Sequence, residues 1–380
     1  MKITFFLPYV DLSGGVRVVA IHARNLQERG HQVQVISLPR KALPFRQKVK
    51  AFLKGFRRLS WRTEDEPSHL DEAGVPWKIL EHPDSVRPEE FPQADVLVPT
   101  WWETVEFARE LPPSKGKLCH FVQAYETFGG PKERVDRGLF LPCPKITVSR
   151  WLKELLETRF AATQVALVPN TVDHDQFRVP PRGKREVPTV GVMYSTSKAK
   201  GCDLAFAAFE EARRSLPELR LVSFGRPEAP DDLPEGTEYH QLPAQDEIPL
   251  IYASCDAWIF PGRNEGFGLP ILEAMACRTP VVGTPTGAAP ELLERGGGIL
   301  VPPEDPKAMA EAILQVVRMD EESWKKMSRK AWETVQGYTW KDASLLFEKA
   351  LERILAPRPL PEPAPQLREA SREITPPVSP

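Results

Sequence analysis

The stretch with the clearest chemical content runs from Glu265 to Pro270, reads Glu-Gly-Phe-Gly-Leu-Pro, and leads to a second carboxylate at Glu273. It follows a predicted strand and opens a predicted helix. Gly266 and Gly268 have no side chain, so the backbone can come close to a ligand there. Proline suits the first helical turn, where its missing N–H is not needed. This pattern indicates a place where backbone and ligand meet.

The start of this helix is suited to a diphosphate, because it offers free N–H groups and the positive end of the helix dipole. We expect Phe267 and Leu269, which flank Gly268, to belong to the same nucleotide-binding turn. Glu273 is placed to accept two hydrogen bonds from a ribose diol, and Glu265 is free to meet sugar hydroxyls. The structural alternative is an ordinary capped helix with an acidic residue in its first turn.

Short apolar runs alternate with helical patterns along the whole chain, which predicts parallel sheets covered by helices on both faces. The expected strands of the first half are residues 3–7, 33–38, 96–98, 118–122, 146–148 and 165–168, with a helix at 16–29. Those of the second half are residues 189–193, 219–224, 257–260, 280–283 and 299–301, with a helix at 203–214. The predicted fold class is therefore α/β, with two doubly wound units.

The predicted organisation is an N-terminal domain at residues 1–175, a linker at 176–187, a C-terminal domain at 188–339, a final helix at 340–356 and a tail at 357–380. The final helix is expected to pack back on the N-terminal domain. The tail is rich in proline and poor in apolar residues, which predicts disorder. Sheets of this kind bind ligands beyond the carboxyl ends of their strands, so the cleft between the domains is the expected site.

Several motifs in order resemble glycosyltransferase family 4. They are Gly14-Gly-Val16, Val168-Pro-Asn-Thr-Val-Asp173, Lys200-Gly201, Glu265-x7-Glu273, Thr279-Pro-Val-Val282 and Gly287-x-x-Pro-Glu-Leu292. The resemblance covers roughly residues 1–355. It implies the GT-B fold, with two Rossmann-like domains facing a cleft, and retaining sugar transfer without a metal. It also implies a nucleotide-diphosphate sugar donor on the C-terminal side and a glycan or lipid-linked acceptor on the N-terminal side.

Carried over by residue, the resemblance implies that Lys200 contacts the donor diphosphate and that Gly14 and Gly15 approach its phosphates. It implies that Glu265 contacts the transferred sugar and Glu273 the ribose. The physics agrees, because a departing nucleoside diphosphate must be neutralised by cations and N–H dipoles if no metal does so. The structural alternatives are a solvated lysine before a helix and a tight glycine turn.

The sequence departs from the family pattern at two positions. Tyr194 stands where members usually have an arginine, and Lys198 or Arg226 is a candidate for the second charge. Gln123 stands near the position of a histidine found in many members, and we predict that it is catalytic together with Lys200 and Glu265.

The residues around Gln123 give further predictions. The Gln-x-Tyr-Glu pattern is similar to a branch acting in cell-surface polysaccharide assembly, and we expect Gln123, Tyr125 and Glu126 to line the site. His120 lies earlier in the strand. For it, a buried and hydrogen-bonded histidine is weighed against a ligand role.

A basic segment lies near the N-terminus, with no acidic residue in it. Its cations are Arg40, Lys41, Arg46, Lys48, Lys50, Lys54, Arg57, Arg58 and Arg62. An apolar stripe at helical spacing runs through it and includes Phe52 and Phe56. A basic amphipathic helix is typical of membrane interfaces, so we predict binding to an anionic membrane surface. The alternative is a helix that packs its stripe on the N-terminal domain.

Composition limits the remaining classes. The net charge of −2 argues against a nucleic-acid binder, and five dispersed cysteines argue against a disulfide framework or a zinc site. The sequence shows no motif for a metal or an organic cofactor. The N-terminus lacks a signal-peptide pattern, and no apolar run reaches the roughly 18 residues that span a bilayer. We therefore expect a cytoplasmic protein, with a peripheral position on the inner face of the membrane as the second expectation.

Two other function classes stay open. One is a GT-B relative that epimerises or hydrolyses nucleotide sugars, which the Lys200, Glu265 and Glu273 set disfavours. The other is a non-catalytic partner that binds a sugar nucleotide, which the absent arginine and histidine favour.

Overall fold

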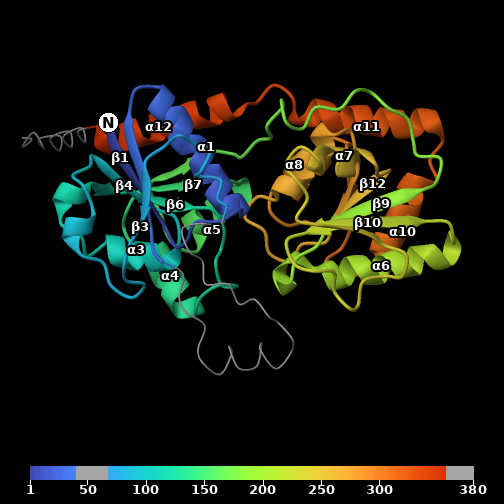
Figure 1. Ribbon diagram of the computed structural model, residues 1–380, viewed down its shortest axis with the longest axis horizontal. Coiled ribbons are helices and arrows are strands. Elements are labelled where there is room, and N and C mark those ends of the chain that lie inside the picture. Colours follow the sequence, from blue (N-terminus) through green and yellow to red (C-terminus); the bar gives the residue numbers. More distant parts are fainter. Residues whose placement is uncertain (40–66, 357–380) are drawn as a thin grey trace, which may run out of the picture.

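The computed structural model describes residues 1–39 and 67–356. The basic segment from Arg40 to Arg62 and the tail at 357–380 lie outside the described residues, so the predictions made for them stay predictions. Figure 1 shows two bodies of α/β structure side by side, with the chain crossing from one to the other and returning at its end.

The N-terminal body contains two parallel sheets. The first has the order β3 (Trp77–Ile79), β2 (Gln32–Ser37), β1 (Lys2–Leu7), β4 (Val96–Pro99) and β5 (Lys117–Leu118). The second has the order β6 (His120–Val122), β7 (Lys145–Thr147) and β8 (Val165–Leu167). Its helices are α1 (Gly14–Glu28), α3 (Trp102–Ala108), α4 (Lys132–Phe140) and α5 (Arg150–Thr158), with short 3-10 turns η1 (Pro88–Glu90) and η2 (Pro113–Lys115).

The C-terminal body contains one parallel sheet of the doubly wound kind. Its order is β11 (Glu238–Gln241), β10 (Arg220–Gly225), β9 (Thr189–Met193), β12 (Ala257–Phe260), β13 (Val281–Gly283) and β14 (Gly298–Leu300). Its helices are α6 (Cys202–Ser215), α7 (Ile248–Ala253), α8 (Leu269–Ala276), α9 (Ala289–Leu293), α10 (Pro306–Val317) and α11 (Glu321–Val335), with the 3-10 turn η3 (Lys198–Lys200). This arrangement confirms the predicted α/β class.

The final helix, α12 (Trp340–Leu355), lies against α1 of the N-terminal body (Figure 1). Arg29 and His31, at the end of α1 and just beyond it, both contact the carboxylate of Glu348, at 2.6 and 2.7 Å. Inside the contact, the side chain of Asn25 donates to the hydroxyl of Ser344 at 2.9 Å. These polar pairs fix α12 in place. The predicted boundaries of the domains stay predictions.

The expected strand at 118–122 is wrong as a single element. Leu118 ends β5 in the first sheet, whereas His120 begins β6 in the second, and Cys119 lies between them. The sequence also did not predict β3 and β11. Both are short edge strands with few buried residues, so the hydrophobic pattern that marks a strand is weak in them.

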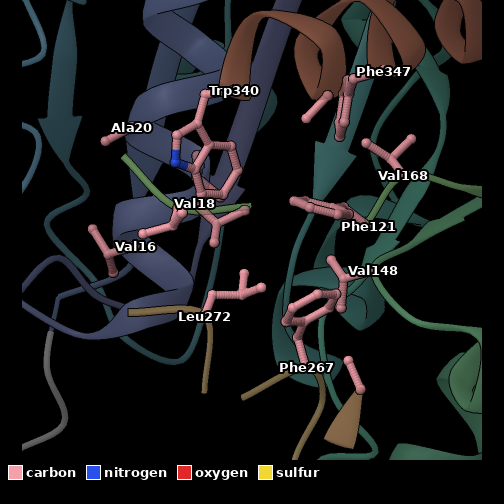
Figure 2. Packing of buried hydrophobic residues seen from close by; sticks show 14 of the residues in the cluster. Val16, Val18, Ala20, Phe121, Val148, Val168, Phe267, Leu272, Trp340 and Phe347 are labelled. Atoms are coloured by element: carbon pink, nitrogen blue, oxygen red, sulfur yellow. The ribbon is translucent and has the colours of Figure 1, made fainter. Parts of the chain in front are cut away.

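Apolar packing is continuous across the two bodies. One core cluster includes Val148 and Phe121 from the N-terminal body together with Phe267 and Leu272 from the C-terminal body. In Figure 2, Phe267 lies beside Val148, and Leu272 lies between Phe267 and Val16 of α1. The start of α1, which carries Val16, and the glycine-rich loop that carries Phe267 are therefore held by the same buried contact that joins the bodies.

Candidate functional site

Lys200 and Glu265 form a direct ion pair. Nζ of Lys200, the last residue of η3, lies 2.8 Å from each carboxylate oxygen of Glu265. The Glu265 side chain is 8% exposed and that of Lys200 33%. The next residue, Gly201, has a φ of +67°, and a Cβ there would lie 2.1 Å from the carbonyl oxygen of Pro261. The two loops thus lie in contact, and this contact places the lysine beside the glutamate.

A small pocket adjoins this pair at the carboxyl ends of the central strands. Besides Lys200 and Glu265, it is lined by Met193, Trp258, Ile259, Phe260, Pro261, Gly262 and Pro270. The pocket therefore combines one cation, one carboxylate and an apolar wall.

Gly266 lies against the N-terminal body. A Cβ at this position would fall 1.7 Å from the carbonyl oxygen of Gln123. The carbonyl of Gly266 accepts hydrogen bonds from Ser149 Oγ at 2.7 Å and Trp151 Nε1 at 2.9 Å. The close backbone approach predicted for Gly266 is present, but the nearest partner is the protein's own chain rather than a ligand.

Gln123 connects the two glycine loops. Its Nε2 donates to the carbonyl of Gly15 at 3.3 Å, while its backbone contacts Gly266. Gly14 and Leu269, the first residues of α1 and α8, are also neighbours, since a Cβ on Gly14 would lie 3.3 Å from Leu269 Cδ1. The first residues of these two helices therefore lie next to one another, and Gln123 contacts Gly15.

Phe267 and Gly268, two residues of the predicted nucleotide-binding turn, have structural roles. The side chain of Phe267 is buried in the core cluster that joins the bodies (Figure 2), so only its backbone is placed to meet a ligand. Gly268 has a φ of +96°, which favours glycine, and a Cβ there would lie 2.7 Å from the ring of Phe260. These residues shape the turn rather than offering side chains to a donor.

Glu273 is already engaged by the protein. Its Oε1 accepts from Nη1 of Arg17 at 2.7 Å, and its Oε2 accepts from the hydroxyl of Tyr252 at 2.8 Å. Arg17 also donates to Oε1 of Gln176 at 2.8 Å. Burial and the neighbouring Glu273 carboxylate raise the pKa of Tyr252 well above its ordinary range, so the hydroxyl keeps its proton. A ribose at Glu273 would have to share a carboxylate that holds two partners.

The sequence reasoning missed Arg17 and Tyr252. Arg17 is the fourth residue of α1, where a cation is disfavoured by the helix dipole. A basic residue in that unfavourable place, two residues after Gly15, is a signal that could have pointed to a carboxylate partner. No comparable signal marks Tyr252, which lies in a short apolar helix and meets Glu273 only in the folded chain.

We expect Arg17→Ala to lower the free energy of unfolding by about 2 kcal/mol, because it leaves Glu273 buried without its cation. Arg24→Ala is the matched control on the same helix, since Arg24 is half exposed and pairs with Glu28 only at 3.9 Å. Urea unfolding of both variants measures the difference. Equal stability of the two variants would show that the Arg17–Glu273 pair does not stabilise the contact between the bodies.

The structure places the two candidates for the second charge differently. Lys198 is exposed on η3, and Tyr194 stacks on Phe206 with ring centroids 6.2 Å apart. Arg226 follows β10 directly, and its Nη1 reaches Oδ2 of Asp11 in the N-terminal body at 3.2 Å. Asp11 also accepts from the backbone N–H of Ser13, just before α1. Arg226 is therefore the candidate that lies between the bodies, next to the Gly14 loop.

The Tyr125 and Glu126 side chains hold the loop after β6. The hydroxyl of Tyr125 donates to Oδ1 of Asp136 at 2.7 Å, and its carbonyl accepts from Nδ2 of Asn264 at 3.3 Å. Glu126 is buried and accepts a hydrogen bond from the backbone N–H of Trp102 at 2.8 Å, at the start of α3. Only the backbone of Tyr125 contacts the C-terminal body through these bonds.

His120 is buried, as expected, but the expected hydrogen bond is absent. Neither ring nitrogen has a hydrogen-bond partner within the part of the chain that the structure describes. Burial, aided by the charge of Lys145, lowers the pKa of His120 to about 3, so the ring is neutral at physiological pH. A ring without partners inside the second sheet fits a packing role.

We expect Glu126→Gln to stabilise the chain at pH 8 by at least about 1 kcal/mol, since one pKa unit corresponds to about 1.4 kcal/mol. Burial raises the pKa of Glu126 well above its ordinary range in the folded chain, whereas the unfolded chain ionises near pH 4.5. The folded state is therefore penalised as the pH rises above 4.5. Glutamine can accept the same bond from Trp102 without titrating.

Urea unfolding at pH 4, 6 and 8 measures this effect, with the exposed Glu133→Gln as control. The gain from Glu126→Gln should grow with pH and vanish near pH 4. A constant difference across this range would mean that Glu126 does not change its protonation state on folding.

In residues 1–39 and 67–356, no three His, Cys, Asp or Glu side chains gather where they could hold a metal ion. None of the helices described there combines the length and the apolarity that crossing a bilayer requires.

Comparison with known proteins relates part of this chain to a family of glycosyltransferases. The family model described as "Glycosyl transferases group 1" matches residues 184–319, which include Lys200, Glu265 and Glu273. The structure of Anabaena HepE in complex with UDP and glucose has a TM-score of 0.69, with 16% identity, over 93% of this chain and 99% of that chain. The chain has the GT-B fold, and its residues 184–319 match a glycosyltransferase family model. This result confirms the predicted GT-B fold.

Curated relatives of this GT-B protein match only in part. The O-antigen chain mannosyltransferase B of Escherichia coli is 37% identical over 83 residues, which are 22% of this chain and 21% of the relative. An exopolysaccharide phosphotransferase of Streptomyces coelicolor is 27% identical over 370 residues, covering 83% of this chain and 37% of the relative. Because the chain spans so little of either relative, a shared substrate does not follow from these matches.

Proposed function

We propose that this GT-B protein is a retaining, metal-independent glycosyltransferase that moves a sugar from a nucleotide-diphosphate sugar to a glycan or lipid-linked acceptor. The observation that carries the proposal is the Lys200–Glu265 pair, with N–O distances of 2.8 Å, beside the glycine-bounded start of α8. A cation and a helix N-terminus at one point suit a leaving diphosphate.

The ion pair suggests an order of events. A donor phosphate that reaches Lys200 competes with Glu265 for the same ammonium group. When Lys200 turns to the phosphate, the Glu265 carboxylate is released and can accept hydrogen bonds from sugar hydroxyls. Binding of the diphosphate thus prepares the group that holds the sugar, and Lys200 stabilises the growing negative charge as the glycosidic bond to the phosphate breaks.

The rest of the neutralising charge comes from both bodies. Arg226 lies between them, held by Asp11, and the first residues of α1 and α8, Gly14 and Leu269, are neighbours. These groups support transfer without a metal, because they supply positive charge where the diphosphate departs. Retention of configuration is proposed from the family resemblance alone.

A nucleotide screen tests the donor side directly. UDP, GDP, dTDP and ADP are compared by thermal shift, and a ligand at about 100 times its dissociation constant should add roughly 2.7 kcal/mol to stability. If none of the four nucleotides stabilises the chain, the proposed donor class is wrong.

Anomeric NMR of early products, with and without acceptor, tests the reaction. Glycosyl transfer predicts release of the nucleoside diphosphate and a new anomeric signal of the donor's configuration, only with acceptor present. Turnover without acceptor would identify a hydrolase or an epimerase. Nucleotide binding without turnover would identify a non-catalytic partner, and release of the nucleoside monophosphate would identify phosphosugar transfer.

Activity is expected to survive chelation within a factor of about two, because the proposed neutralising groups are Lys200, Arg226 and backbone N–H groups. Initial rates in excess EDTA are compared with rates after magnesium is restored. A loss of activity that only a divalent metal restores would contradict the metal-independent reaction.

For the acceptor and for the location of the protein in the cell, we propose only a general class. One relative is by name an O-antigen chain mannosyltransferase, which suits an acceptor used in cell-surface polysaccharide assembly. A lipid-linked acceptor would place the chain in the cytoplasm at the inner face of the membrane, where cations such as those from Arg40 to Arg62 favour anionic lipid.

A further inference from the structure

Three aromatic rings gather on the N-terminal body, on residues that no motif of the donor site includes. The ring centroids of Tyr9 and Trp101 are 6.5 Å apart, and those of Trp101 and Phe128 are 5.9 Å apart, with interplanar angles of 63° and 64°. The Phe128 side chain is 53% exposed, and Tyr9 and Trp101 are partly exposed. We call these three residues the aromatic platform.

The platform lies where a parallel sheet binds ligands. Tyr9 follows β1, Trp101 follows β4 and Phe128 follows β6, each beyond the carboxyl end of its strand. β1 pairs with β4, and β6, which begins the second sheet, lies in contact with β4. Residues at these strand ends are exposed on the side on which open α/β sheets bind their ligands.

The loop carrying Phe128 is built to keep this arrangement. A Cβ on Gly129 would lie 2.5 Å from Cη2 and Cζ2 of Trp101, so a larger residue there would displace that ring. The N–H of Gly129 donates to the carbonyl of Glu126 at 2.9 Å, and the backbone N–H of Trp101 donates to Thr104 Oγ1 at 3.0 Å. These bonds position the backbone of the loop and of Trp101. The rings stay partly exposed, although exposed apolar surface is unfavourable.

The same loop begins at the candidate active site. Gln123 contacts the Gly15 carbonyl and Gly266, and Phe128 is five residues further on, at most about 17 Å away along an extended chain. A ligand on the platform is therefore within reach of the transfer site. The donor-side groups Lys200, Glu265 and Glu273 belong to the other body, so the platform is on the side opposite the donor.

We propose that the aromatic platform binds the acceptor as a carbohydrate chain, with pyranose rings stacked on Trp101 and Phe128. One face of a pyranose presents C–H groups, which pack on the negative face of an aromatic ring, while the hydroxyls at its edge stay hydrated. A platform made of three aromatic rings suits such a neutral, repeating ligand. This inference rests on the proposed function and adds to it the class of the acceptor and the residues that recognise it.

The test is saturation-transfer NMR on the full chain with three probes: maltohexaose, chitohexaose and a mannohexaose. Irradiating the aromatic protons should give signals from the ring C–H protons of at least one probe, and Phe128→Ala should weaken its affinity at least fivefold. Phe128→Tyr, which keeps the aromatic ring, should bind the probe as tightly as the wild type does. Phe140→Ala is the matched control, because Phe140 is 56% exposed on the same body and packs on Phe160 outside the platform.

Three outcomes would overturn the proposal. They are the absence of signals from all three probes, unchanged binding by Phe128→Ala, and an equal loss in Phe140→Ala. Vesicles of anionic lipid are run in parallel, and a loss of vesicle binding specific to Phe128→Ala, with no oligosaccharide signal, would identify a lipid surface instead. The nucleotide screen on the wild type separates the two ideas, since it reports the donor site whatever the oligosaccharides do.

Discussion

Lys200→Ala should lower kcat/KM by at least about 100-fold, equivalent to about 3 kcal/mol of transition-state stabilisation. Lys200 contacts Glu265, the carboxylate proposed to hold the sugar, with both N–O distances at 2.8 Å. Removing it takes away the charge that we propose to face the departing diphosphate, and it leaves Glu265, which is 8% exposed, without this counterion. The loss should appear in kcat as well as in KM, because the charge on the leaving group grows as the bond breaks.

Lys198→Ala is the matched control for this variant. Lys198 lies on the same 3-10 turn, two residues earlier, but its side chain is exposed. Steady-state rates and urea unfolding are measured for both variants, so that a loss of stability is not taken for a loss of chemistry. If Lys200→Ala keeps near-wild-type turnover, or if both variants lose activity equally, the assignment of the diphosphate site is wrong.

Gly266→Ala is expected to abolish most activity, by about 100-fold or more, while each sheet stays folded. A Cβ at this position would lie 1.7 Å from the carbonyl oxygen of Gln123 and 2.8 Å from its carbonyl carbon, and both are backbone atoms that cannot rotate away. The loop that carries Glu265 must then move away from the N-terminal body by more than about 1 Å. A displacement of that size at a reacting centre can cost about 100-fold in rate.

Gly236→Ala is the control in the same body. Gly236 has a φ of +79°, but no atom of the described residues lies within 4 Å of the place that a Cβ would take, so alanine there meets strain without a clash. We expect a loss of about 1 kcal/mol in stability and unchanged turnover. Circular dichroism and steady-state rates measure both variants. Wild-type activity in Gly266→Ala would show that close contact between the glycine loop and Gln123 is not needed for the reaction.

Much of the local structure follows from the sequence. The strands at Thr189–Met193 and Ala257–Phe260 are confirmed with the predicted bounds, and the final helix, predicted at 340–356, is present at Trp340–Leu355. Buried parallel strands are continuous apolar runs, and α12 begins with a Thr339 cap, so both carry strong local signals. The short edge strands β3 and β11 carry no such signal, because they are only partly buried and have one neighbour each.

The candidate site was predictable only in its residue types. Glu265 and Gly266 in the loop and Glu273 in α8 are recognisable in the sequence, because their spacing along a turn and a helix fixes their relative positions. The same spacing says nothing about their partners. Arg17 meets Glu273 across 256 positions, and Gln123 meets Gly266 across 143, so neither contact has a local pattern that reveals it.

The sequence by itself therefore determined the α/β class, the resemblance to GT-B enzymes and the candidate residues for a diphosphate site. Only the tertiary structure decided that Lys200 and Glu265 are bonded, that Glu273 is held by Arg17 and Tyr252, and that three aromatic rings meet beside the site. The physical reason is that periodicity and turn chemistry act within a few residues. Ion pairs and ring contacts instead depend on how the folded sheets bring distant loops together.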